Sequence, residues 1–183
     1  GLNILGAHID SPRLDLKQNP VYENNGFAFL DTHYYGGIKH YQWVTLPLAL
    51  HGVVAKTDGT VVDVNVGDDA GDPVFCVTDL LPHLGNQQMA KKGSEVVEGE
   101  NLDVLIGNRP LKVEPADDAS DEEKAAAKEP VKAFALKLLE EKYGITEEDF
   151  LSAEIEVVPA GRARELGFDR SMVIGYGQDD RVC

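Results

Sequence analysis

The chain has 183 residues, 43% of them hydrophobic and 27% charged, so it can bury a core in one large domain or two small ones. A formal net charge of −15 argues against nucleic acid or an anionic membrane as a partner, and no apolar run reaches the ~20 residues that span a bilayer. The two cysteines, Cys76 and Cys183, are too few for a disulfide scaffold or a Cys-rich zinc site and favour the reducing cytoplasm.

The chain begins and ends with apolar strands. Residues 2–9 form a nearly continuous apolar run, which is typical of a strand covered on both faces in an α/β sheet. A second such run at residues 172–176 predicts the last strand. Because both runs lie at the very ends, we expect the chain to be a piece of a longer protein.

The middle of the chain is predicted to be rich in β-structure. Asp58-Gly59 between two β-like runs indicates a hairpin. Residues 61–66 alternate with period two, which is typical of a half-exposed antiparallel strand. The spacing of the turns favours a barrel or a sandwich. The other β-like runs are 27–30, 43–50, 53–56, 74–77 and 102–106.

Residues 121–143 carry the one long helical pattern. Ser120 and Glu123 predict a capping box at its start, and Gly144 predicts its end. Pro130 should kink this helix or divide it in two. A short second helix is predicted from residue 146 and a strand at 153–159. The face expected to pack against the core consists of Val131, Phe134, Leu138 and Leu139.

Polar residues follow the first strand. His8 and Asp10 are two residues apart and therefore share one face of a strand at its carboxyl end, where open α/β sheets bind ligands. An imidazole is a good zinc ligand, and a nearby carboxylate can orient it. Taken alone, a hydrogen-bonded structural pair remains the commoner explanation of this spacing.

Two acidic residues follow the last strand. Asp179 and Asp180 cannot share one face, so at most one of them would bind a metal, and the other would point elsewhere or pair with Arg181. A carboxylate can bridge two divalent ions through its two oxygens. Taken alone, a surface turn also explains this pair.

In their order along the chain, these motifs resemble the aspartyl aminopeptidase and yeast vacuolar aminopeptidase I family of di-zinc exopeptidases. The resemblance extends over essentially the whole chain, and its first motif is the most specific. The matching segments are residues 6–14, residues 35–37 with Trp43 downstream, residues 81–84 and residues 179–181.

The resemblance implies a role for each matching residue. His8 would bind one zinc ion, Asp10 would orient His8, and Asp179 would bridge the two ions of a complete subunit, while other divalent metals stay possible. Asp180 would support the site. His83 would reach into the active site of a neighbouring subunit and help to bind substrate there. A homo-oligomer, either a dimer or a dodecamer of dimers, would then be part of the chemistry.

The resemblance also implies a fold and an activity. Pieces of an α/β/α catalytic domain, residues 1–16 and 154–183, would flank an inserted β-rich, barrel-like dimerisation domain with one or two helices, residues 17–153. The parent would be a cytoplasmic metalloaminopeptidase that removes N-terminal residues from peptides. Its metal-bound water would attack the first peptide carbonyl.

The chain departs from the family pattern in two respects. Thr45-Leu46-Pro47 stands where eukaryotic members carry charged residues, which points to a bacterial-type member with a broader or neutral preference. The family's paired glutamates, a further aspartate and a last histidine would follow Cys183. His8 and Asp179 alone are too few ligands for zinc, so we expect the fragment itself to be inactive.

The alternative reading is a non-catalytic oligomerisation or binding module whose ends only resemble metal motifs. His33, His40 and His51 match no metal spacing and are interpreted as surface or packing histidines. Trp43 is interpreted as part of the module core or of a dimer interface.

Overall fold

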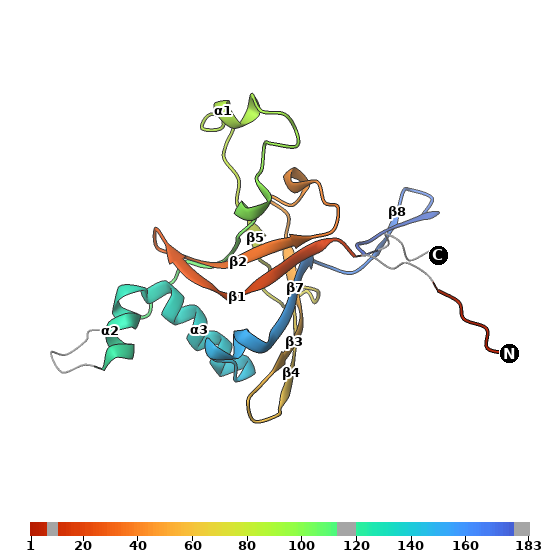
Figure 1. Cartoon of the computed structure of the whole chain (residues 1–183). Helices are drawn as coiled ribbons and strands as arrows, with labels where there is room; N and C mark the ends of the chain where they lie inside the picture. The colour runs from red at the N-terminus through yellow and green to blue at the C-terminus, as the bar shows by residue number, and fades with distance from the viewer. Residues whose placement is uncertain (7–10, 113–119, 178–183) are drawn as a thin grey trace.

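A computed structural model describes residues 1–6, 11–112 and 120–177. Within these residues, one seven-stranded antiparallel sheet has the order β4-β3-β7-β1-β2-β6-β5, and β8 pairs with β9 in a second sheet (Figure 1). The strands are β1 (Arg13–Asn24), β2 (Phe27–Tyr35), β3 (Leu48–Ala55), β4 (Val61–Val66), β5 (Cys76–Val77), β6 (Val104–Gly107), β7 (Ala153–Pro159), β8 (Arg164–Leu166) and β9 (Met172–Ile174).

Short helices connect the strands. In the described part of the chain, none of them is long and apolar enough to cross a membrane. The α-helices are α1 (Asn86–Met89), α2 (Asp121–Lys128) and α3 (Pro130–Tyr143), and the 3₁₀ helices are η1 (His40–Gln42), η2 (Gly99–Asn101) and η3 (Glu148–Ser152).

The large sheet curls until its β5 end meets the start of β3. The backbone N–H of Leu48 donates to the carbonyl of Phe75 at 2.7 Å, and the N–H of Phe75 donates back at 2.9 Å. A further bridge joins Val44 to Val77. The predicted barrel-like β-rich module is therefore confirmed, with β4 as an additional strand outside the closure.

Local sequence signals account for the β3–β4 hairpin. The turn at Asp58-Gly59 leaves Ala55 paired with Val61, as predicted. Val64 and Val66 are buried, whereas Asp63 and Asn65 are exposed, because successive side chains of a strand alternate between its faces.

The long helical pattern is divided at Pro130, as predicted. The Ser120 hydroxyl accepts from the Glu123 N–H at 3.2 Å, and the Glu123 carboxylate accepts from the Ser120 N–H at 2.8 Å, so the capping box is present. Pro130 occupies the first turn of α3, where it needs no N–H partner. Gly144 ends α3 with φ of +64°.

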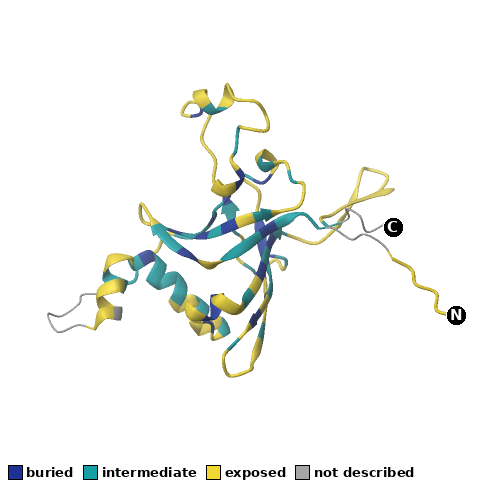
Figure 2. Ribbon diagram, in the orientation of Figure 1, coloured by how far each residue is buried: buried dark blue, intermediate teal, exposed yellow. Residues whose placement is uncertain are grey.

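The core lies inside the curl of the sheet, and α3 packs against it (Figures 1 and 2). Leu14, Leu48, Val104 and Val157 are fully buried and come from four different strands. Leu138, predicted to pack on the core face of α3, is 49% exposed instead, because it lies at the rim of a cavity under the helix.

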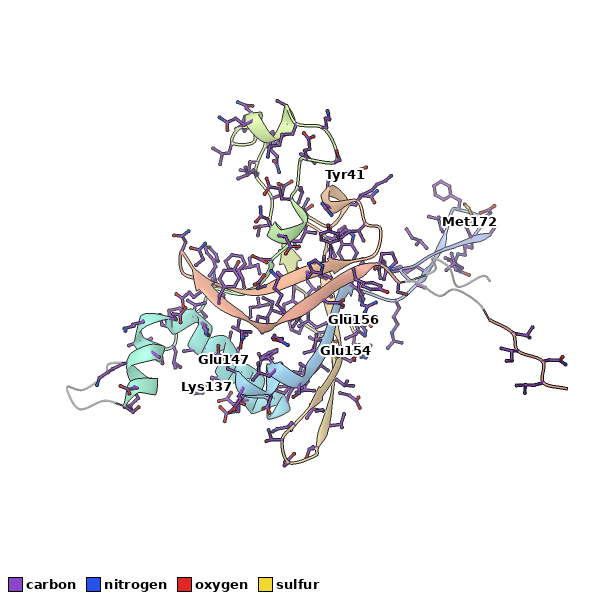
Figure 3. All side chains as sticks on the ribbon, in the orientation of Figure 1. Tyr41, Lys137, Glu147, Glu154, Glu156 and Met172 are labelled. Carbon is purple, nitrogen blue, oxygen red and sulfur yellow. The ribbon has the colours of Figure 1, made fainter. Side chains whose placement is uncertain are left out.

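The ends of the chain differ from the predicted buried strands. Residues 1–6 form no strand and are exposed, and β9 is a short exposed strand whose Met172 stands away from the large sheet (Figure 3). Residues 7–9 of the first predicted strand lie outside the described residues. A strand buried on both faces needs neighbouring strands and covering helices, whereas β9 pairs only with β8 and is exposed within the described residues.

Other elements differ in detail. The predicted strand at 43–50 begins only at Leu48, and the predicted helix from residue 146 is the 3₁₀ helix η3. β1 was not predicted at all. The residues Arg13–Leu16 of β1 belong to the predicted segment 1–16, all of β2–β6 to the segment 17–153, and β7 after Ala153 to the segment 154–183. These strands nevertheless share one sheet. The division into residues 1–16, 17–153 and 154–183 stays a prediction.

Candidate functional site

A pocket of about 420 Å³ is lined by residues close in sequence to both predicted metal motifs. Pro12 and Gly177 both line it. Pro12 is two residues after Asp10, and Gly177 is two residues before Asp179. Residues that flank the first and last predicted metal motifs therefore meet, although more than 160 positions separate them in the sequence. The remaining lining residues are Gly37, Ile38, Lys39, Gln42, Trp43, Gly175 and Tyr176.

Close packing holds the walls of this pocket. The ring of Trp43 is 6% exposed and meets the ring of Tyr176 edge-on, with 5.8 Å between the ring centroids. Gly36 has φ of +73°, and a Cβ at this position would lie 3.3 Å from Pro12. The interpretation of Trp43 as core is confirmed, since it belongs to the main hydrophobic cluster.

Arg13, three residues after Asp10, links strand β1 to its neighbour β7. Its Nε donates to Asp15 Oδ1 at 2.8 Å and lies 2.9 Å from Glu156 Oε1, so it ties β1 to β7. The guanidinium also lies 4.5 Å from the centre of the Tyr35 ring. Partial burial lowers the pKa of Arg13, but the hydrogen bond and charge of Asp15 and the charge of Glu156 outweigh it and raise that pKa overall. Arg13 therefore stays charged and fixes the direction in which the chain leaves the sheet.

Four residues of the predicted site, His8, Asp10, Asp179 and Asp180, lie outside the described residues. The described residues contain no group of three or more His, Cys, Asp or Glu side chains that could hold a metal ion. The structure therefore describes residues close in sequence to the two predicted metal motifs, and the metal site itself stays a prediction.

His83 is not among the residues that line this pocket. It occupies a turn in the long connection between β5 and β6, residues 78–103, which we call the β5–β6 extension. Figure 1 shows this extension, with α1 at its tip, standing away from the sheet. His83 is exposed, and Leu81 and Leu84 beside it are 66% and 73% exposed.

The base of the extension is held firmly. The His33 Nδ1 atom lies 2.8 Å from Glu100 Oε1, and the His40 Nδ1 atom lies 3.1 Å from the Val97 carbonyl oxygen. A Cβ on Gly99 would lie 2.3 Å from the Tyr34 ring, so only glycine fits there. The exposed tip is therefore carried on a fixed base.

The remaining histidines have structural partners. His51 Nε2 lies 3.1 Å from Asp68 Oδ2, and His33 and His40 hold the extension as described. The interpretation of these three as surface or packing histidines is confirmed for the described contacts.

A partly buried polar cluster at the base of the extension was missed from the sequence. The Tyr22 hydroxyl donates to Asp103 Oδ2 at 2.5 Å, and the fully buried Thr32 hydroxyl donates to the Leu102 carbonyl at 2.8 Å. Burial raises the pKa of the Asp103 carboxyl, against the lowering effect of the Tyr22 hydrogen bond. The period-two pattern of β2 places Thr32 on the inner face, which is the one signal that could have indicated this cluster.

Comparison with known proteins identifies the family. A sequence model described as Aminopeptidase I zinc metalloprotease (M18) matches residues 1–183, the whole chain. The chain belongs to the M18 family of zinc metalloproteases. The resemblance to the aminopeptidase I group is thereby confirmed.

Bacterial M18 relatives match along the full chain. A probable M18 family aminopeptidase 1 of Clostridium acetobutylicum is 62% identical over 183 residues, and one of Thermotoga maritima is 54% identical. Both matches cover 100% of this chain but only 37% and 38% of the relatives. The chain thus spans little more than a third of the length of these M18 proteins.

Solved M18 structures share the fold. The crystal structure of the Thermotoga maritima aminopeptidase superposes with a TM-score of 0.82 at 51% identity, covering 97% of this chain and 36% of that one. The crystal structure of aminopeptidase I from Clostridium acetobutylicum gives a TM-score of 0.81 at 59% identity, with the same coverages. The curled antiparallel sheet with few helices is therefore the M18 arrangement for this region.

Proposed function

We propose that this chain is the part of an M18 aminopeptidase that carries the first metal motif, the oligomerisation module and the bridging aspartate. The parent protein would remove N-terminal residues from peptides in the cytoplasm. One observation carries the proposal: the residues that flank the two predicted metal motifs, Pro12 and Gly177, line one pocket.

The predicted donors suit zinc. His8 offers an imidazole nitrogen and Asp179 a carboxylate, which are common zinc ligands. Asp10 would hold the tautomer and orientation of His8. Two zinc ions, when bound, would activate water and polarise the substrate carbonyl. Trp43, Lys39 and Gln42 would form a wall beside them, against which a peptide end could lie.

The chain alone should not hydrolyse peptides. His8 and Asp179 are two ligands, whereas zinc sites in catalytic centres use three protein ligands. The relatives are nearly three times as long as the matched region, so the remaining ligands and the general base would come from elsewhere in the parent.

The β5–β6 extension supports homo-oligomerisation. Its exposed tip holds apolar side chains that water solvates poorly, including Leu81 and Leu84. The extension points away from its own sheet (Figure 1), so His83 would act on a neighbouring subunit. A yeast structure with the same fold, 15% identical with a TM-score of 0.58, is a dodecamer, and we propose that the parent of this chain also assembles.

Zinc binding tests the metal proposal. Calorimetric titration of zinc into the metal-free full-length parent should show uptake that His8→Ala strongly reduces. His51→Ala is the matched control, because His51 pairs with Asp68 and should not affect uptake. Equal uptake by wild type and His8→Ala would contradict the metal site and favour the non-catalytic module.

Activity tests the rest. The full-length parent should cleave chromogenic aminoacyl substrates, and a chelator should abolish the cleavage, whereas the 183-residue chain should be inactive. Mixing inactive His8→Ala and His83→Ala parents should restore activity if His83 serves a neighbouring subunit. No recovery in mixed oligomers would refute that role for His83.

A further inference from the structure

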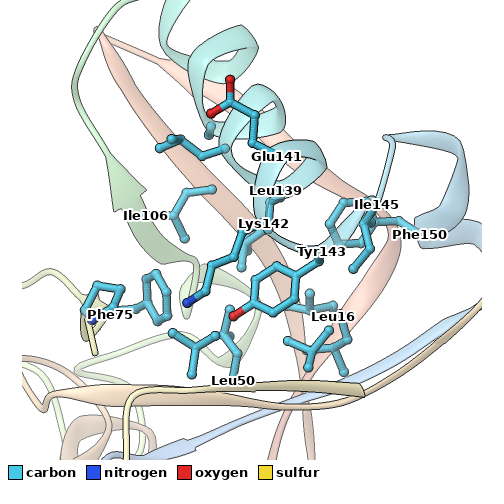
Figure 4. A pocket seen from close by; sticks show the side chains of 17 residues that line it. Leu16, Leu50, Phe75, Ile106, Leu139, Glu141, Lys142, Tyr143, Ile145 and Phe150 are labelled. Atoms are coloured by element: carbon cyan, nitrogen blue, oxygen red, sulfur yellow. The ribbon is translucent and has the colours of Figure 1, made fainter. Parts of the chain in front are cut away.

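A second, larger cavity lies inside the curled sheet, under α3. Its volume is about 460 Å³, and apolar side chains from six strands of the sheet converge on it, Leu50 of β3 among them. Phe75, just before β5, and Leu139 of α3 also line it (Figure 4). Cavities at the mouths of β-barrels, in the range of ~300–1,000 Å³, are common ligand sites. None of the residues that line this cavity lines the pocket beside the two predicted metal motifs.

The cavity is large and poorly suited to water. One water molecule occupies ~30 Å³ of liquid and needs two to four polar partners. Apolar walls provide almost none, and the lining atoms of an empty space lose their dispersion contacts. An apolar ligand would restore those contacts, and it would not have to displace tightly bound water.

Two hydrogen-bond donors meet at one end of the cavity. Figure 4 shows the Tyr143 hydroxyl and the Lys142 ammonium pointing into the same part of it. The Tyr143 hydroxyl is buried and has no hydrogen-bond partner of normal geometry within the described residues. The Lys142 ammonium lies 5.1 Å from the centre of the Tyr143 ring. A ligand group that accepts hydrogen bonds would satisfy both.

The neighbouring carboxylates are engaged elsewhere. Glu141, which also lines the cavity, pairs with Lys137 at 3.7 Å. Asp72 accepts from the N–H groups of Gly67 at 3.0 Å and Asp69 at 3.3 Å. The nearby hydroxyl of Tyr143 is the main cause that raises the pKa of Lys142, and the charge of Asp72 adds to it. Lys142 is therefore a cation that forms no ion pair among the described side chains.

We propose that this cavity binds a small monocarboxylate with an apolar tail, its carboxylate held by Lys142 and Tyr143 and its tail lying against Leu50, Phe75 and Leu139. A straight tail of roughly eight to twelve carbons suits a pocket at the lower end of the usual size range. Leu138, Glu141 and Lys142 are exposed and mark the entrance at the C-terminal half of α3. This site is independent of the proposed peptidase activity.

Decanoate is the probe, and decanol is the control with the same tail but no carboxylate. Isothermal titration into the purified chain should show saturable binding of decanoate and binding of decanol weaker by about tenfold, because a hydrogen bond to a charged group is lost. Lys142→Met should reduce decanoate affinity by about tenfold and leave decanol affinity unchanged. Lys128→Met, in α2 outside the cavity, removes the same charge and should change neither affinity.

Two further variants keep the proposal testable if one of them misfolds. Tyr143→Phe removes only the hydroxyl and should weaken decanoate binding severalfold. Ala135→Phe fills the cavity from α3 and should abolish binding of both probes.

Four results would overturn the proposal. The first is no saturable decanoate binding, and the second is a decanoate affinity of Lys142→Met equal to that of wild type. The third is binding by the 183-residue chain but not by the full-length parent, and the fourth is dissociation of a dimer of the chain by decanoate in sedimentation. Either of the last two results would mean that side chains of another segment or copy occupy the cavity.

Discussion

Replacing Glu23 by alanine should remove the N-terminal cap of α3. The helix has no side-chain cap of its own, because Glu129 at its start accepts no such hydrogen bond. Glu23 of β1 takes this place: its Oε2 atom accepts from the N–H of Val131 at 2.8 Å and from the N–H of Lys132 at 3.1 Å. The strand therefore fixes both the position and the polarity of the helix start.

The magnitude follows from these two bonds. Loss of a capping side chain costs about 0.5–2 kcal/mol, and loss of a negative charge at a helix N-terminus costs about 0.3–1 kcal/mol. Glu23 is half-buried, so water replaces it incompletely. We expect Glu23→Ala to lower the free energy of unfolding by about 1–2 kcal/mol, or about 3–6 °C in Tm. Glu23→Gln keeps an acceptor oxygen and should cost about half as much.

Urea unfolding followed by circular dichroism measures both losses. Glu154→Ala is the matched control, because Glu154 is an exposed glutamate on β7 whose side chain makes no hydrogen bond or ion pair with the described residues (Figure 3). A loss below about 0.3 kcal/mol for Glu23→Ala, or an equal loss for Glu154→Ala, would refute the cap.

Two other predictions follow from close contacts and from titration. Gly99→Ala should destabilise the chain by about 1–3 kcal/mol in urea unfolding, because its Cβ would overlap the Tyr34 ring, whereas Gly37→Ala, where a Cβ meets nothing within 4 Å, should have little effect. The N–H and hydroxyl of Thr146 donate to Asp149 Oδ2 at 2.8 Å each and lower the pKa of this carboxyl from 3.8. Because this pKa is lower in the folded than in the unfolded chain, the ionised Asp149 stabilises the fold above pH 3.8, and this stabilisation is lost as the pH falls through the folded-state pKa. Asp149→Asn should therefore lower the free energy of unfolding at pH 7, and the difference from wild type should fade below pH 3.8. An undiminished difference at about pH 3 would contradict this assignment.

The sequence by itself determined the features that depend on neighbouring residues. The Asp58-Gly59 hairpin, the Ser120–Glu123 capping box and the stop at Gly144 follow from backbone preferences within a few residues. The family could be recognised for the same reason, since each motif that carries the resemblance lies within a short segment, and the M18 family model matches the whole chain.

The tertiary structure alone decided what depends on distant partners. β1 was not foreseen because Pro20 and the polar residues beside it oppose a strand, yet β2 pairs with β1 on both sides of a register shift between Leu16 and Val21. The meeting of Pro12 with Gly177, the capping of α3 by Glu23 and the cavity under α3 join residues far apart in the sequence. Periodicity reports which face of an element is apolar, but not which distant element will cover that face.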